Sequence, residues 1–266
     1  MTRRIVLVTG ASSGIGAATA ERFSRRGARV VLVARNASRL ADVARKISKR
    51  DGDSHPYAAD LSSADEVADV AERITAEVGV PDVIVNNAGA GRWAPLAETS
   101  ADELRQMIDV PLMAALYVTR SFLPGMIERR SGSIVCVTSP ASFLAWSDAC
   151  GYIVARRGLK GFCDALRLEV KPAHLHVALV VLGAVDTPYW SNNPGSRVAI
   201  PTTHPVLMPK LTAEDAATAI ERAVDRRRRM VVEPPIFRLL FALNAIAPRL
   251  VERGMRVAAK FAKRVR

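Results

Sequence analysis

Residues 5–16 read IVLVTGASSGIG, a run of apolar and β-branched residues that passes into a glycine-rich turn. The apolar run predicts a buried strand, and the residues after Gly16 have the apolar spacing of an amphipathic helix. Glycines at such a junction let the backbone turn sharply and approach a pyrophosphate, while the helix N-terminus offers free N–H groups to the anion. The stretch therefore predicts a dinucleotide-binding turn. The residues expected to contact the pyrophosphate are Gly10, Ser12, Ser13, Gly14, Ile15 and Gly16.

The rest of the chain alternates short β-branched runs with amphipathic stretches of helical length. The expected strands are 5–9, 30–34, 55–59, 82–86, 133–138, 175–182 and 230–233, and the expected helices are 14–26, 37–50, 63–78, 101–129, 150–170, 213–227, 236–247 and 249–265. This alternation is typical of an α/β fold with a doubly wound parallel sheet and helices on both faces.

A length of 266 residues fits one such domain. We expect it to span residues 1–233 and to include the proline-rich segment 187–212 as an irregular substrate loop. Residues 234–266 are expected to form a helical extension.

The composition excludes several classes of protein. Hydrophobic residues make up 49% and charged residues 24% of the chain, which argues against disordered, collagen-like and transmembrane proteins. The three cysteines lack metal-ligand spacing, and the apolar run at residue 5 has no signal peptide before it, so we expect a cytoplasmic protein. The four histidines form no ligand spacing with carboxylates or cysteines, and no metal site is expected.

The net charge of +12 is concentrated near the C-terminus. Residues 226–266 carry twelve Arg or Lys against Glu233 and Glu252, a net +10. Apolar side chains at 237–246 and basic ones at 253–266 leave two alternatives. The tail lies in an anionic membrane interface, or it packs over the substrate cleft or a partner subunit with a solvated basic end. The apolar run is too short to span a bilayer, and the basic residues lack a recognisable nucleic-acid-binding fold.

The end of the second expected strand bears on cofactor choice. It reads Ala34-Arg35-Asn36, with Arg39 one helical turn on. NAD sites usually place an acid here to accept a hydrogen bond from the ribose 2′-OH. Ala34 cannot do so, and the cation after it can pair with a 2′-phosphate. The pattern favours NADP(H), with Arg35, Asn36 and Arg39 as contacts; the alternative is an ordinary solvated arginine.

Further motifs follow in order: Asp60-Leu61, Asn86-Asn87-Ala88-Gly89, Ser139 and, thirteen residues later, Tyr152. Together with the glycine-rich turn, they resemble the short-chain dehydrogenase/reductase family over about residues 4–190. The resemblance implies a Rossmann fold with strand order 3-2-1-4-5-6-7, hydride transfer between nicotinamide and a carbonyl or alcohol carbon, and a homo-oligomer. It assigns cofactor contacts to Asp60, Leu61, Asn87, Ala88, Gly89, Tyr152, Arg156, Gly183, Val185 and Thr187.

The resemblance also implies the catalytic residues, with two departures. Tyr152 corresponds to the family's acid or base, and Ser139 to the residue that orients the substrate oxygen. The family's lysine four residues after the tyrosine is Arg156 here, which keeps the charge that lowers the phenol's pKa but cannot release a proton. The family's helix-distorting asparagine is Pro111 here, which lacks an N–H and predicts a kink in the helix.

These features predict an NADP(H)-dependent oxidoreductase that acts on an apolar, lipid-, steroid- or polyketide-like carbonyl or alcohol. Trp93, Phe143 and Trp190 are expected to border its substrate. The alternative is an NADP(H)-binding protein with little catalysis, in which the changes to Pro111 and Arg156 reflect the loss of dehydrogenase activity. Both hypotheses predict cofactor binding, and only the first predicts turnover.

Overall fold

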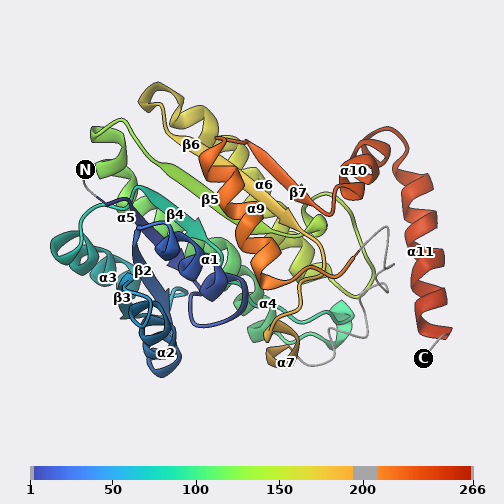
Figure 1. The fold of residues 1–266 in the computed structure, drawn as a ribbon. Coiled ribbons are helices and arrows are strands. Elements are labelled where there is room, and N and C mark those ends of the chain that lie inside the picture. The colour runs from blue at the N-terminus through green and yellow to red at the C-terminus, as the bar shows by residue number, and fades with distance from the viewer. Residues whose placement is uncertain (1–2, 194–208, 265–266) are drawn as a thin grey trace.

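A seven-stranded parallel sheet forms the centre of the protein in a computed structural model that describes residues 3–193 and 209–264, apart from the side chains of residues 192 and 258–264 (Figure 1). The strands are β1 (Ile5–Thr9), β2 (Arg29–Ala34), β3 (Asp53–Ala58), β4 (Val83–Asn86), β5 (Ser133–Thr138), β6 (His176–Leu182) and β7 (Met230–Glu233). Their order is β3-β2-β1-β4-β5-β6-β7, which confirms the predicted order. Every residue of β5 and β6 is buried, as expected for parallel strands covered on both faces.

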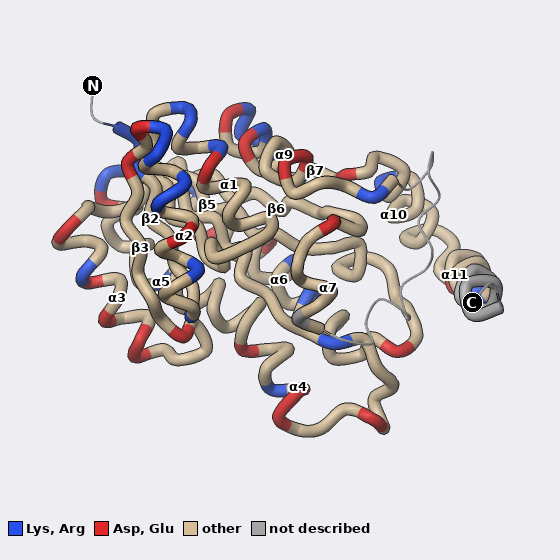
Figure 2. Tube along the Cα trace, turned by 60° about the horizontal axis from the view of Figure 1, so that its bottom comes forward, with Lys and Arg blue, Asp and Glu red and all other residues tan. Residues whose placement is uncertain are grey.

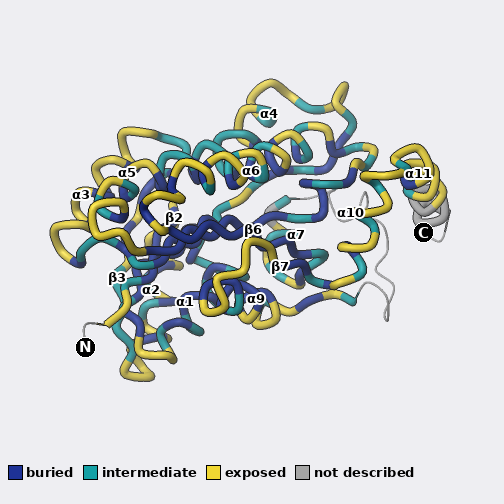
Figure 3. Tube along the Cα trace, turned by 90° about the horizontal axis from the view of Figure 1, so that it is seen from above, coloured by how far each residue is buried: buried dark blue, intermediate teal, exposed yellow. Residues whose placement is uncertain are grey.

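Helices cover both faces of the sheet (Figure 3). One face packs against α1 (Gly14–Arg25), α2 (Ala37–Ser48) and α9 (Ala213–Asp225), and the other against α3 (Ala64–Glu77), α5 (Ala114–Glu128) and α6 (Cys150–Glu169). Short 3-10 turns span Leu96–Glu98, Pro140–Ser142 and Lys171–Ala173. The doubly wound fold is therefore confirmed.

The position of β1 explains where a ligand can bind. This strand pairs with β2 on one side and with β4 on the other. The chain leaves the carboxyl ends of β1 and β4 toward opposite faces, because α1 covers one face and the segment after β4 leads to α5 on the other. Such a switch point opens a crevice at the carboxyl ends of the strands.

The helix expected at 101–129 is interrupted. It consists of α4 (Ala101–Ile108), a π-helical segment (Asp109–Met113) and α5. Pro111 lies buried within the π-helical segment, where its missing N–H removes one donor from the regular helical ladder. A wider helical turn thus interrupts the regular helix at the proline where a kink is expected.

The segment expected to be irregular contains a short helix, α7 (Tyr189–Asn192). Pro188 precedes its first residue, a position where the missing N–H is not needed. The rest of that predicted loop, residues 194–208, lies outside the described residues. After β7, α10 (Ile236–Ile246) and α11 (Pro248–Arg264) follow at the edge of the sheet, and α11 stands beside the body (Figure 1).

His176 makes stability depend on pH. It is 6% exposed, and its ring nitrogens face the Ser133 hydroxyl at 3.3 Å and the Arg228 carbonyl oxygen at 3.1 Å. Burial lowers the pKa of this imidazole. Below the ordinary histidine pKa of about 6.5, the unfolded chain takes up a proton that the folded protein resists. We therefore expect the free energy of unfolding to fall as pH drops toward about 5.

Urea unfolding of the wild type and of His176→Gln over this pH range measures the contribution. The variant should lose part of the decline in unfolding free energy between about pH 7 and 5, because it has no proton to take up. Equal pH dependence in the two proteins would contradict this assignment.

Candidate active site

The Thr9 side chain joins the ends of β1 and β4. Its hydroxyl accepts hydrogen bonds from the backbone N–H groups of Asn87 at 2.9 Å and Ala88 at 3.0 Å, and it donates to the Val85 carbonyl at 3.3 Å. The Asn87 side-chain amide donates in turn to the Thr9 carbonyl at 3.0 Å. These bonds fix the floor of the crevice between the two strands.

The turn between β1 and α1 has the form of an anion cradle. Gly10 and Gly14 have positive φ values of 65° and 52°, which side chains rarely adopt. A Cβ atom at Gly16 would overlap the Gly10 carbonyl oxygen, so α1 can begin this close to β1 only because Gly16 has no side chain. Ser13 precedes the helix without capping an amide, whereas Ser63 caps α3. The first-turn N–H groups of α1 therefore remain available to an anion.

A cavity of about 840 Å³ follows the carboxyl ends of the strands. It contains all the predicted cofactor residues except Gly16, which lies beneath the turn, and it contains the predicted Ser139 and Trp190 as well. Its lining includes Gly10, Ser12, Ser13, Gly14, Ile15, Arg35, Asn36, Arg39, Asp60, Leu61, Asn87, Ala88, Gly89, Ser139, Tyr152, Arg156, Gly183, Val185, Thr187 and Trp190. A ligand in this space would touch both the cradle and the polar groups of β5 and α6.

One end of the cavity is charged. The exposed side chains of Arg35 and Arg39 lie on its rim beside Asp60. The Ser62 backbone N–H donates to the Asp60 carboxylate at 3.0 Å and holds the pKa of that group below its ordinary value, and Arg35 contributes in the same direction. Asn36 also caps α2, because its side-chain oxygen accepts from the Arg39 amide at 2.9 Å.

The other end brings together Ser139, Tyr152 and Arg156. Ser139 follows β5, whereas Tyr152 and Arg156 lie one turn apart on α6. The guanidinium carbon of Arg156 is 4.8 Å from the centroid of the Tyr152 ring. Arg156 is only 7% exposed, and its Nε has no hydrogen-bond partner among the described residues. The group is thus a buried cation that faces the cavity beside a phenol and retains a free donor.

Sequence reasoning missed Ser142, which supports this arrangement. Its hydroxyl shares a hydrogen bond of 2.7 Å with the Thr138 hydroxyl and donates to the Arg156 carbonyl at 2.8 Å. The end of β5 is therefore tied to the turn of α6 that carries Tyr152 and Arg156. No motif or periodicity in the sequence marks this bridge.

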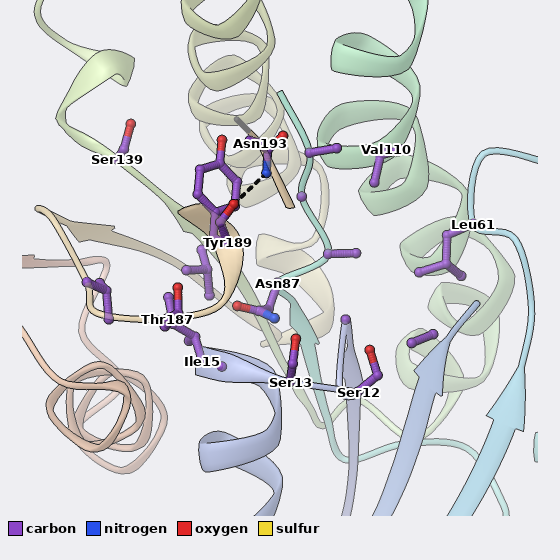
Figure 4. Close-up of a pocket in the computed structure, with 18 of the residues that line it drawn as sticks. Ser12, Ser13, Ile15, Leu61, Asn87, Val110, Ser139, Thr187, Tyr189 and Asn193 are labelled. Carbon is purple, nitrogen blue, oxygen red and sulfur yellow. Dashed lines mark hydrogen bonds between the residues drawn. The ribbon is translucent and has the colours of Figure 1, made fainter. Parts of the chain in front are cut away.

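Tyr189 of α7 and Asn193, the residue after this helix, also line the cavity (Figure 4). The Tyr189 hydroxyl donates to the Gly91 carbonyl at 2.6 Å, and the Asn193 side-chain oxygen accepts from the Gly91 amide at 3.1 Å. Burial raises the pKa of Tyr189, the nearby Tyr152 adds to this effect, and Arg156 opposes it. Tyr189 is therefore a neutral donor. The only signal for it in the sequence was its place beside Trp190.

Three predicted site residues do not line the cavity. Trp93 packs behind Tyr152, with the ring centroids 5.5 Å apart. Phe143 stacks on Phe241 of α10 at 4.2 Å, so its apolar face is covered by the tail. Pro111 is buried within its π-helical segment, and the neighbouring Val110 lines the cavity instead. The structure therefore does not place the Trp93 and Phe143 rings in the cavity, because Tyr152 and Phe241 pack against them, and Pro111 interrupts the regular helix instead of contacting the ligand space.

Comparison with known proteins identifies the family. Residues 4–196 match the family model described as short chain dehydrogenase. The chain belongs to this family. An uncharacterized oxidoreductase of Mycobacterium bovis is 32% identical over 255 residues, which cover 94% of this chain and 72% of that protein.

Solved structures of the same kind superpose well. A short-chain dehydrogenase from Sphingobium yanoikuyae in complex with NADPH has a TM-score of 0.80 and 26% identity, covering 96% of this chain and 95% of that one. A metagenomic short-chain oxidoreductase in complex with NADP has a TM-score of 0.72 and 30% identity, covering 86% and 96%. The protein is an oxidoreductase of the short-chain dehydrogenase family.

The close approach at Gly16 yields a test of the cradle in this short-chain dehydrogenase. Gly16→Ala should weaken NADPH binding at least about tenfold, because the methyl group must push α1 away from the Gly10 carbonyl. Fluorescence titration measures the affinity, and a melting curve verifies folding. The matched control is Gly161→Ala, where the new methyl meets open space and binding should not change. Equal NADPH affinity in both variants would contradict the assignment.

Proposed function

We propose that this protein is an NADP(H)-dependent oxidoreductase that transfers a hydride to or from the carbonyl or alcohol carbon of an apolar substrate. The observation that carries the proposal is one continuous cavity that holds an anion cradle and, at the end away from Arg35 and Arg39, the group of Ser139, Tyr152 and Arg156. The cradle suits the pyrophosphate of a dinucleotide, and the second group suits proton transfer to an oxygen atom.

Preference for NADP(H) is supported by the charge at the end of β2. Arg35 and Arg39 line the rim, and Ala34 stands where an acid would select the 2′-hydroxyl of NAD. Both solved relatives described above were obtained with NADPH or NADP. The two guanidinium groups would pair with the additional phosphate.

Each polar residue at the catalytic end has a distinct role in the proposed reaction. The bound cofactor would supply or accept the hydride. In the reduction, Tyr152 gives its hydroxyl proton to the substrate oxygen, and in the oxidation it takes that proton back. The Ser139 hydroxyl donates a hydrogen bond to the same oxygen. The Arg156 guanidinium lies over the Tyr152 ring and lines the cavity, where its terminal N–H groups can hold a ribose hydroxyl.

The surroundings of this end favour an apolar substrate. Val110, Val185 and Trp190 line the cavity there, and the Trp190 indole N–H is already bonded to the Val185 carbonyl at 2.8 Å. Trp93 supports the Tyr152 ring from behind. A lipid-, steroid- or polyketide-like carbonyl compound matches this lining.

The second candidate is a cofactor-binding protein with little turnover. It is favoured by the position of the Arg156 guanidinium, which lies over the Tyr152 ring. Arginine also cannot pass a proton onward in the way that a lysine can.

Replacement of the phenol distinguishes the two functions. Tyr152→Phe should lower NADPH oxidation with hydrophobic ketones and aldehydes by about 100-fold or more, and leave NADPH affinity within about twofold, because only the hydroxyl is removed. The reaction is followed by loss of NADPH absorbance. If the wild type binds NADPH but reduces no carbonyl, and Arg156→Lys with Pro111→Asn creates activity, the second candidate is correct.

The phosphate preference has its own test. Arg35→Ala with Arg39→Ala should weaken NADPH binding about 10- to 100-fold, because charge-assisted hydrogen bonds to the 2′-phosphate are lost. NADH affinity of the same variant is the internal control and should stay within about twofold, since NADH lacks that phosphate. An equal loss for the two cofactors would contradict a 2′-phosphate role.

A further inference from the structure

Helix α10 is apolar on both sides, although one side faces solvent. Phe237 and Phe241 pack inward against the core. On the opposite side Leu239 and Ile246 are 64% and 84% exposed. Arg238 is the one charged residue in this helix (Figure 2). A helix that is apolar all round is normally covered on both sides, so the outer side of α10 lacks a partner.

Helix α11 continues this exposed surface and adds charge to it. Val251 and Met255 pack against the core, whereas Leu250 and Val257 are 60% and 53% exposed. The exposed arginines of the same helix are Arg249, Arg253 and Arg256. A cavity of about 250 Å³ separates the start of α11 from α6. The helix therefore rests on the body along a narrow edge and presents apolar and basic edges outward.

The exposed apolar side chains of α10 and α11 form the largest group of exposed large apolar residues in the described parts of the chain. Five of the ten exposed large apolar side chains there lie on α10 and α11. We call them the tail face: Leu239, Leu243, Ile246, Leu250 and Val257. Contiguous exposed apolar residues beside polar ones mark an interaction site.

The charge around the tail face selects its partner. Residues 234–266 contain eight Arg or Lys and a single acid, Glu252. A second copy of the chain seated on this face would bring two basic surfaces together, which is unfavourable. An anionic bilayer interface instead accepts apolar side chains below its headgroups and pairs basic ones with its phosphates.

We propose that the tail face docks on an anionic lipid surface. The helices lie on the bilayer, because the apolar α10 (Ile236–Ile246) is too short to cross it. Leu239, Ile246 and Leu250 enter the acyl boundary, and Arg253 and Arg256 contact headgroup phosphates.

The docked face lies next to the cavity. Phe241 stacks on Phe143, and the Asn244 side-chain amide donates to the Phe143 carbonyl at 3.1 Å. Phe237 packs beside Gly183, which lines the cavity. Docking thus places the substrate end of the cavity beside the bilayer, where an apolar carbonyl compound would be dissolved. This last step rests on the proposed function, whereas lipid docking itself does not.

Co-sedimentation with vesicles tests the docking. The full chain is mixed with phosphatidylcholine vesicles or with mixed phosphatidylglycerol–phosphatidylcholine vesicles at low and high salt. It should pellet with the anionic vesicles, and less so as salt screens the charges. Because the readout needs no turnover, a failure of docking and a failure of the proposed enzyme activity are separable.

Two variants and their matched controls locate the contact. Arg253→Glu with Arg256→Glu should lower the partition coefficient at least about 25-fold, since each lost basic residue weakens binding about fivefold. Leu239→Ser, Ile246→Ser and Leu250→Ser together should lower it about tenfold or more. Each control places a like change on a distant exposed surface. These controls, expected to bind as the wild type, are Arg226→Glu with Arg228→Glu and Leu168→Ser.

Equal vesicle binding by the wild type and all variants, or vesicle binding that does not depend on lipid charge, would overturn the proposal. So would an absence of vesicle binding together with a dimer in light scattering that becomes a monomer in the apolar variant. That result would assign the tail face to a second copy of the chain.

Discussion

The close approach of α1 to the end of β1 is the constraint on which the rest of the cavity depends. With only a hydrogen atom at Gly16, the helix begins directly under the Gly10 carbonyl and points its unpaired N–H groups into the crevice. The Thr9 hydroxyl then holds the end of β4 at the same level. Because β1 is central in the sheet, this contact fixes the separation between the charged end of the cavity and the catalytic end.

Much of this arrangement could be predicted because parallel strands end at one edge of the sheet. Arg35, Asp60 and Ser139 follow the ends of β2, β3 and β5, so the strand order alone brings them to the same crevice. Contacts between distant segments carry no such signal. The bond from Tyr189 to Gly91 joins residues 98 positions apart, and it depends on how α7 folds back over the site. The stacking of Phe143 on Phe241 likewise depends on the docking of the tail, which local periodicity does not encode.

The catalytic end contains a buried cation, the guanidinium of Arg156, that a ligand can stabilise. A buried guanidinium is unfavourable unless its donors are paired. Here the Tyr152 ring offers a cation–π contact and the Nε–H remains without a partner in the described parts of the chain. Because the guanidinium lines the cavity, a hydroxyl of a bound dinucleotide would accept a hydrogen bond from its terminal N–H groups. The arginine therefore contributes to ligand affinity, and a lysine with its compact charge would present its donors differently.

Helix α10 lies between the wall of the cavity and the exposed surface of the tail. The inner side of α10 packs against the segments that carry Phe143 and Gly183, and its outer side bears Leu239 and Ile246. A partner that covers the outer side would also restrict the inner side, because α10 is short and its Phe237 and Phe241 pack against the core. A covering surface would therefore stabilise the wall of the cavity as well as orient its opening. For an apolar substrate, the compartment in which that substrate dissolves is the surface that fits both requirements.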